Sequence, residues 1–308
     1  MNIEITERSR ASEPRRFDAQ GSLWVAWIPG VMPVLVAIGL GGRLPDWVWM
    51  WVLALALILG AKWITLSAVR GGQTKIKRWR LLAYVFLWPG MDARRFLNDS
   101  NSAPPPIEEW ILAAGKMLFG GGLLWAATRL VGPGHPLVTG WVGMIGIGFV
   151  LHFGLFHLAS LFWRALGIEA RPIMRSPGTA TSLSEFWGGR WNAAFSDLVR
   201  GHLFKPLARH LGARGALFTI FLFSGVVHEI VISLPARGGY GLPTAYFLLQ
   251  GLGLLIERSS IGWRLGLGAG WKGWCSVALV AGAPAFWLFH PVFIRNVILP
   301  MLQAIGAT

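Results

Sequence analysis

Long apolar runs alternate along the chain with polar and basic segments. The runs cover 22–40, 47–66, 108–131, 138–162, 215–234, 243–257 and 273–293. A helix that spans a bilayer takes about 20 mostly apolar residues, so this pattern predicts about seven spanning helices. The run at 81–90 is too short to cross and predicts an interfacial or re-entrant helix that ends at Pro89-Gly90. The pattern therefore predicts an all-α polytopic membrane protein.

Composition supports the membrane assignment. Hydrophobic residues make up 54% of the 308 residues and charged residues 14%, against roughly 25% charged residues in soluble domains. The 18 tryptophans suit repeated crossings of the water–lipid interface. The net charge of +14 is explained by basic loops held at an anionic membrane surface, so membrane lipids and not nucleic acids are the expected polyanionic partners. A single cysteine, Cys275, excludes an internal disulfide.

Loop charges predict the orientation. The loops 67–80 and 163–214 are rich in lysine and arginine, whereas the short links 41–46 and 132–137 hold one such residue between them. By the positive-inside rule the polar tail 1–20 and both basic loops face the cytoplasm. We expect residues 21–308 to form a single multi-pass membrane domain.

The basic loop 163–214 contains helix signals. Ser182 and Glu185 have the spacing of a capping box, which predicts a helix that begins near Leu183. In such a helix Trp187 and Trp191 lie one turn apart on a shared face. The segment 198–211 suits a helix that lies flat on the membrane surface. In the apolar run 138–162, four glycines indicate close packing between helices: Gly140, Gly143, Gly146 and Gly148.

His228 is the most informative polar residue, because it lies deep within the run 215–234 beside Glu229. Ionisable side chains at that depth are costly and usually mark function, although a structural His–Glu pair would also account for them. The hydroxyl of Ser224, one turn earlier, either orients the imidazole or bonds to its own helix. Gly225 thins the helix and could admit a substrate chain. No metal site is expected, because Ile232 stands where a zinc-binding second histidine would be required.

Two motifs in this order resemble a known family. Ser184 to Asn192 reads SEFWGGRWN, and Ser224 to Glu229 reads SGVVHE. Together with Trp88 to Asp92 (WPGMD), they resemble the wax synthase branch of the membrane-bound O-acyltransferase superfamily. The resemblance implies a multi-helix membrane enzyme that transfers a long-chain acyl group from acyl-CoA to the hydroxyl of an alcohol or lipid. It matches the family's intramembrane histidine to His228 and its motif asparagine to Asn192. Two features differ from the family: Gly189 stands where the family often has a basic residue, and the chain has fewer spans. They leave the size and identity of the acyl donor open.

Elementary chemistry assigns roles to these residues. A neutral His228 can act as general base toward the acceptor hydroxyl. Asn192 either donates a hydrogen bond to the thioester oxygen or orients His228. The resemblance implies acyl-CoA as cosubstrate, with no tightly bound cofactor and no acyl-enzyme. Further expected substrate or CoA contacts come from Trp187, Arg190, Trp191, Lys205, Arg209, Ser224 and Glu229. The two tryptophans could equally be interfacial anchors.

Other functions share some of these features. A proton-coupled transporter or flippase would also place an ionisable pair such as His228 and Glu229 inside the membrane, but no internal repeat is visible. A short-chain O-acetyltransferase would use the same chemistry on a sugar or secondary metabolite. A scaffold subunit would need no histidine at this depth.

Overall fold

The computed structural model describes residues 19–69, 76–98, 102–132 and 134–308. Every regular element in these residues is helical, which confirms the predicted all-α fold. Most of the predicted polar tail 1–20, the centre of the basic loop 67–80 and the start of the segment after α4 lie outside the described residues.

Four continuous helical stretches are long and apolar enough to cross a membrane, and they cover Asp46–Ser67, Ile107–Val131, Pro136–Ala165 and Ala193–Ala236. A fifth is counted if Gly270–Leu288 and Pro291–Ala304, which meet at an angle of 51°, form one bent span. Trp27–Ile38 and Leu242–Glu257 are shorter apolar helices. All seven predicted runs overlap these helices, so the polytopic class is confirmed. Only four or five stretches of the described chain reach the length and apolarity of a span, fewer than the predicted seven, because the runs 22–40 and 243–257 lie on shorter apolar helices. The second half of the bent pair was not predicted.

The first half of the chain builds two of three groups of helices. The N-terminal group is α1 (Ala19–Ile38), α2 (Asp46–Ser67), α3 (Arg78–Phe86) and α4 (Ala93–Leu97). The central group is α5 (Ile107–Gly121), η1 (Gly122–Ala127), α6 (Thr128–Val131), α7 (Pro136–Gly148), η2 (Phe149–Leu155) and α8 (Phe156–Ala165). The elements labelled η1, η2 and η4 to η8 are π-helical, and η3 is a 3-10 turn.

The second half supplies the motif segment and the C-terminal group. The motif segment is η3 (Pro177–Thr179), α9 (Leu183–Glu185), η4 (Phe186–Arg190), α10 (Ala193–Val199), η5 (Arg200–Phe204), α11 (Lys205–His228), η6 (Glu229–Ser233) and α12 (Leu234–Ala236). The C-terminal group is α13 (Leu242–Glu257), α14 (Ser260–Leu265), α15 (Gly270–Val277), η7 (Ala278–Gly282), α16 (Ala285–Leu288), α17 (Pro291–Phe293), η8 (Ile294–Ile298) and α18 (Leu299–Ala304).

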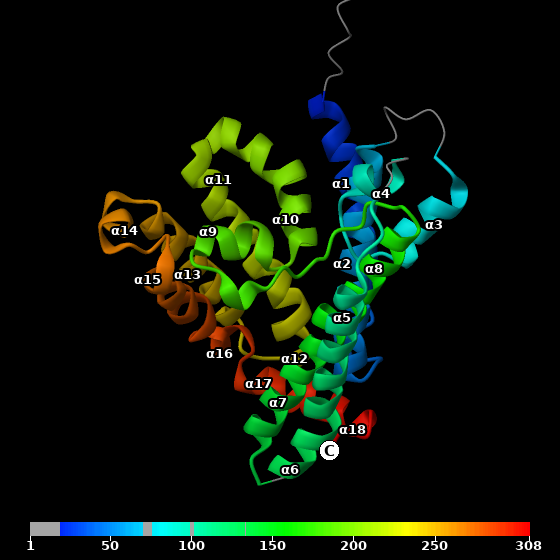
Figure 1. Cartoon of the computed structure of the whole chain (residues 1–308), viewed down its shortest axis with the longest axis vertical. Coiled ribbons are helices and arrows are strands. Elements are labelled where there is room, and N and C mark those ends of the chain that lie inside the picture. Colours follow the sequence, from blue (N-terminus) through cyan, green and yellow to red (C-terminus); the bar gives the residue numbers. More distant parts are fainter. Residues whose placement is uncertain (1–18, 70–75, 99–101, 133) are drawn as a thin grey trace, which may run out of the picture.

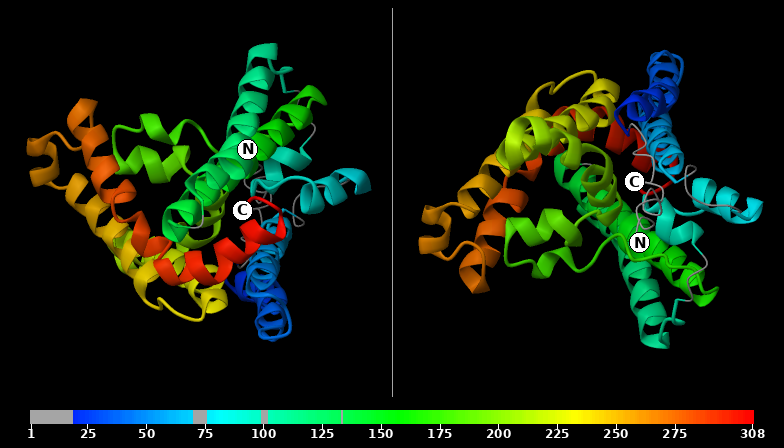
Figure 2. Two further views of the ribbon diagram at one scale, coloured as in Figure 1. Left: turned by 90° about the horizontal axis from the view of Figure 1, so that it is seen from below. Right: turned by 90° about the horizontal axis from the view of Figure 1, so that it is seen from above.

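These groups lie side by side. In Figures 1 and 2, α13 to α15 form one flank, α1 to α4 form the opposite flank, and α5 to α8 stand nearer the second. A loop after α8 crosses to the first flank, where it enters α9 (Figure 1). The motif segment is thereby placed against α11 and α13.

Glycines on α7 let the C-terminal helices approach closely. A Cβ added at Gly140 would lie 2.2 Å from the side chain of Ile294, and one at Gly143 would lie 2.5 Å from that of Leu302. Gly146 faces the backbone of Leu124 at 2.9 Å by the same measure. The predicted packing role is confirmed for these three glycines, whereas Gly148 faces open space.

The motif Trp88 to Asp92 is held by a buried lysine of α2. Nζ of Lys62 donates to the carbonyl of Gly90 and lies 3.6 Å from the ring centroid of Tyr84 on α3. Asp92 accepts from the backbone N–H of Arg95 at 3.1 Å and thereby caps α4. The first helix of this region, α3, has only nine residues, in keeping with a segment too short to cross.

Candidate functional site

His228 ends α11, and its imidazole is fixed by its own helix and by α13. Nδ1–H donates to the carbonyl oxygen of Ser224 at 2.7 Å. Because a carbonyl can only accept, Nδ1 holds the proton, and in the neutral ring Nε2 keeps its lone pair. The ring of Phe247 lies against the imidazole, with 4.4 Å between the centroids. The ring is therefore oriented with its basic nitrogen away from the helix backbone.

Ser224 and Gly225 serve the helix packing around His228. The hydroxyl of Ser224 donates to the carbonyl of Ile220 at 2.9 Å, so its backbone and not its side chain orients the imidazole. A Cβ added at Gly225 would lie 2.7 Å from Cα of Thr244. The space beside Gly225 is thus filled by α13, where the sequence had suggested a substrate chain.

Glu229, the next residue, caps the beginning of α13. One carboxylate oxygen accepts from the backbone N–H groups of Gly241 at 2.9 Å and Thr244 at 3.1 Å, and from the Thr244 hydroxyl at 2.9 Å. A negative charge is favourable at a helix N-terminus. The other oxygen is buried and makes no hydrogen bond to any residue that the structure describes. Glu229 therefore fixes α13, which presents Phe247 to His228.

The helix that leads into the FWGGRWN motif begins where the sequence predicts. The hydroxyl of Ser182 accepts from the backbone N–H of Glu185 at 3.0 Å, and α9 starts at Leu183. A second cap comes from Glu257, a buried residue at the end of α13. Its carboxylate accepts from the N–H of Leu183 at 2.5 Å and from the N–H and hydroxyl of Ser184 at 3.0 and 2.6 Å. The motif is thus anchored on α13.

Trp187 links the motif to His228. Its ring lies 5.9 Å from that of Phe221 on α11 and 5.7 Å from that of Phe247 on α13. Its indole N–H donates to the side-chain oxygen of Gln250 at 3.3 Å. Because Phe247 contacts both Trp187 and His228, one aromatic side chain joins the two sequence motifs.

The turn after Trp187 is π-helical, which changes the predicted facing of the tryptophans. The backbone N–H of Trp191 donates to the carbonyl of Phe186 at 2.8 Å, and the two rings stack at 5.6 Å. A five-residue turn therefore pairs Trp191 with Phe186, and Trp187 points instead into the α11–α13 contact. The prediction that Trp187 and Trp191 share one face is wrong, because it assumed a regular α-helix.

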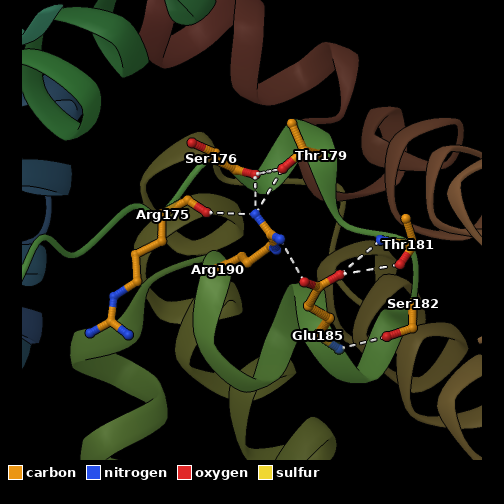
Figure 3. Close-up of polar contacts among 7 residues, drawn as sticks. All are labelled: Arg175, Ser176, Thr179, Thr181, Ser182, Glu185 and Arg190. Atoms are coloured by element: carbon orange, nitrogen blue, oxygen red, sulfur yellow. Dashed lines mark hydrogen bonds and ion pairs between the residues drawn. The ribbon is translucent and has the colours of Figure 1, made fainter. Parts of the chain in front are cut away.

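Arg190 is the centre of a polar network (Figure 3). Its guanidinium pairs with Glu185 at 2.6 Å and donates to the hydroxyl of Thr179 at 2.7 Å and to the carbonyls of Arg175 and Ser176 at 3.3 and 3.2 Å. The backbone N–H of Thr181 and the pairing with Arg190 hold the pKa of the Glu185 carboxyl below its usual 4.5. In this structure Arg190 closes the loop 175–190 on itself.

Asn192 stands at the exit of the motif in a left-handed conformation, with φ 45° and ψ 64°. Its side-chain oxygen accepts from the N–H of Phe195 at 3.2 Å and caps α10, and its backbone N–H donates to Sδ of Met174 at 3.3 Å. Over the described residues its NH2 group makes no hydrogen bond to protein. That group remains available as a donor.

The remaining predicted contacts lie toward the surface. Lys205 and Arg209 are exposed on the first two turns of α11, before the break at Gly212, where φ is 67°. The helix changes direction at this break. The two turns that carry Lys205 and Arg209 and the segment that leads to His228 therefore form separate arms of an arch (Figure 1). Trp191 is 36% exposed beside its partner Phe186.

Sequence reasoning missed the face of α13 that organises this region. On this face Phe247 contacts His228 and Gln250 bonds to Trp187. Glu257 bonds to the start of α9. Gln250 is fully buried and also donates to the carbonyl of Val280 at 2.7 Å. A buried amide within an apolar run is costly unless it is bonded, so Gln250 could have been noticed by the same reasoning as His228.

Comparison with known proteins finds a family that resembles this part of the chain. Residues 170–249 match the membrane bound O-acyl transferase family, a range that holds both FWGGRWN and His228. The resemblance to the membrane-bound O-acyltransferase superfamily is therefore confirmed.

Individual relatives narrow the resemblance to the wax synthase-like branch. The chain is 29% identical to a long-chain-alcohol O-fatty-acyltransferase of Simmondsia chinensis, over 42% of this chain and 40% of that protein. It is 30% identical to "Probable long-chain-alcohol O-fatty-acyltransferase 7" of Arabidopsis thaliana, over 42% of each chain. It is 28% identical to acyl-CoA–sterol O-acyltransferase 1 of the same plant, over 53% of this chain and 51% of that protein. The chain thus spans between two fifths and half of the length of these three relatives.

Proposed function

We propose that this protein is an acyl-CoA-dependent O-acyltransferase that esterifies a long-chain alcohol or a related lipid hydroxyl. The contact that carries the proposal is Phe247, whose ring lies 5.7 Å from Trp187 of the FWGGRWN motif and 4.4 Å from His228. Two motifs separated along the chain, and typical together of one enzyme family, thereby meet on one helix. The names of the relatives support fatty acyl donors and alcohol or sterol acceptors.

In the proposed reaction His228 is the general base. Nε2 takes the proton from the acceptor hydroxyl while the alkoxide oxygen bonds to the thioester carbonyl carbon. The tetrahedral oxyanion then collapses, the carbon–sulfur bond breaks, and the CoA thiolate takes the proton back from the imidazolium. The hydrogen bond from Nδ1 to the Ser224 carbonyl supports this role, because it also stabilises the positive ring.

Asn192 is proposed to donate its unpaired NH2 group to the thioester oxygen. A donor of this kind contributes about 3 kcal/mol when it faces the oxyanion. The alternative, orientation of His228 by Asn192, would need a hydrogen bond between the two side chains, and the bonds that Asn192 makes in this structure run to Phe195 and Met174. We therefore favour the oxyanion role.

For the donor's CoA part we propose contacts with the exposed Lys205 and Arg209, with Trp187 and Trp191 beside the pantetheine. Arg190 would act mainly by shaping the loop, because its guanidinium is bonded to Glu185 and Thr179. The basic segments, with the N-terminus, are proposed to face the cytoplasm, where acyl-CoA is found.

The test uses membranes that contain the wild-type protein. Labelled palmitoyl-CoA and hexadecanol are added, and the wax ester and the free thiol are quantified. The proposal expects both products in equal amounts and dependence on the alcohol. Alcohol-independent uptake or release of lipid, with no ester and no thiol, would favour the transporter instead. Acetyl-CoA in place of palmitoyl-CoA tests the short-chain alternative.

Asn192→Ala tests whether the Asn192 side chain contributes to the catalytic rate or only to folding. We expect a loss in kcat of ~100-fold, as for other oxyanion donors, with normal amounts of protein in the membrane. Asn192→Asp keeps an oxygen that can cap α10, but replaces the NH2 donor, so it should be slow as well. Normal kcat in both variants would remove Asn192 from the proposed mechanism.

A further inference from the structure

A cavity of about 710 Å³ lies between α5, α8 and the loop 169–176. Its walls include Lys116 of α5, His157 and Arg164 of α8, and Arg171 and Arg175 of the loop. The loop is the segment that crosses from α8 to the motif in Figure 1. None of these side chains belongs to the site proposed above.

Positive charge exceeds negative charge in this cavity. Its acidic residues are Glu109 and Glu169, and each is paired with an arginine of the wall: Arg164 lies 2.6 Å from Glu109, and Arg171 lies 2.8 Å from Glu169. Lys116 and Arg175 are then left without an acidic partner on the cavity wall.

The two excess cations are available to a ligand. Lys116 is half-buried on a spanning helix and makes no ion pair or hydrogen bond within the described chain. Arg175 uses only Nε, which donates to the carbonyl of Pro172 at 3.3 Å. Figure 3 shows its side chain extending away from the Arg190 network. A lysine held inside the bilayer is costly unless an anion or water accompanies it.

The cavity wall is joined to the FWGGRWN motif. The cavity residue Met174 accepts from the backbone N–H of Asn192 at 3.3 Å. The carbonyls of Arg175 and Ser176 accept from the guanidinium of Arg190. A ligand that moves this wall would therefore move the motif that contacts His228 through Phe247.

We propose that this cavity binds a phosphate ester, held by Lys116 and by the two free Nη groups of Arg175. The planar fork of an arginine suits two phosphate oxygens, and a lysine adds a third contact as a point charge. The phosphate could come from coenzyme A or from the headgroup of a phospholipid. The first source rests on the proposed function, whereas the second does not.

The experiment measures binding without turnover. Purified protein in neutral detergent is titrated with coenzyme A, which has no acyl group, and in a second arm with short-chain phosphatidic acid. Lys116→Met/Arg175→Met is compared with Arg43→Met/Lys272→Met, which removes the same charges from exposed positions. We expect one probe to bind the wild type and the control pair, and to bind the cavity variant ~10–100-fold more weakly, because charge-assisted bonds are lost.

Each outcome decides the proposal. Weakened coenzyme A binding assigns the phosphate to the acyl donor, and weakened phosphatidic acid binding assigns it to a lipid. Binding of neither probe, or equal binding by the cavity variant and the control, overturns the proposal. Thermal unfolding of both variants shows whether they fold. This assay forms no ester, so its result stays valid even if the protein proves not to be an acyltransferase. If the protein forms ester but the cavity variant binds both probes as tightly as the control, the cavity proposal is wrong and the proposed function stands.

Discussion

Replacing Glu257 by glutamine should release the motif segment. The carboxylate accepts three hydrogen bonds from Leu183 and Ser184, at 2.5, 3.0 and 2.6 Å. Glutamine keeps one oxygen and turns an NH2 group toward backbone donors, so at least one charge-assisted bond is lost and one buried donor loses its partner. Such losses cost about 2–3 kcal/mol.

Hydrogen exchange followed by mass spectrometry measures this opening locally. If α9 opens as a unit, 2–3 kcal/mol should raise the exchange rate of a peptide covering 181–192 by about 30- to 150-fold. Peptides from α7 should not change. The control is Glu108→Gln, which alters an exposed glutamate on the first turn of α5. Unchanged exchange at 181–192 in Glu257→Gln, in a protein that is otherwise folded, would refute the role of Glu257 as the anchor of the motif.

Three further predictions concern the loop, a helix crossing and the buried amide. Because the pKa of Glu185 is lowered by the Thr181 N–H and by Arg190, the folded loop binds fewer protons than the unfolded one. Its protection from pepsin, a protease that is active in acid, should therefore be greatest near pH 4.5 and fall as the pH drops through the lowered pKa; Glu185→Gln should abolish this dependence. Gly60→Ala should lower the thermal unfolding midpoint, at a cost of about 1–3 kcal/mol, because its Cβ would lie 2.1 Å from a carbonyl oxygen of α1. Gly148→Ala is the control and should leave the midpoint unchanged, because Gly148 faces open space. Gln250→Leu should lower the free energy of unfolding by about 1–3 kcal/mol in chemical denaturation, because the indole N–H of Trp187 and the carbonyl of Val280 would each lose a hydrogen-bond partner. An unchanged midpoint would contradict the bonding role of Gln250.

The helices and the N-terminus of the motif helix could be predicted because their causes are local. Apolar runs of bilayer length predict helices, and Ser182 with Glu185 at its third following position predicts where α9 begins. The structure follows both signals, although the side chain of Glu185 reaches the N–H of Thr181 and not that of Ser182. His228 was identifiable because an ionisable residue within an apolar run is energetically costly and usually marks function.

What the sequence could not provide depends on contacts between distant residues. The anchoring by Glu257 joins α13 to α9 through residues that lie 74 and 73 positions apart in the chain, and the π-helical turn follows directly after this contact. Lys62 reads as a charge that interrupts a spanning helix until its bond to Gly90 and its contact with Tyr84 are seen. No local pattern contains such pairings.

If His228 is the general base, its replacement must abolish most of the ester formation. Wax ester synthesis from palmitoyl-CoA and hexadecanol is compared between the wild type, His228→Ala and His135→Ala, which changes an exposed histidine before α7. We expect His228→Ala to lower kcat about 10²–10⁴-fold, while all three proteins unfold at similar temperatures and His135→Ala keeps full activity. Wild-type kcat in folded His228→Ala would contradict the assignment of this imidazole as the general base.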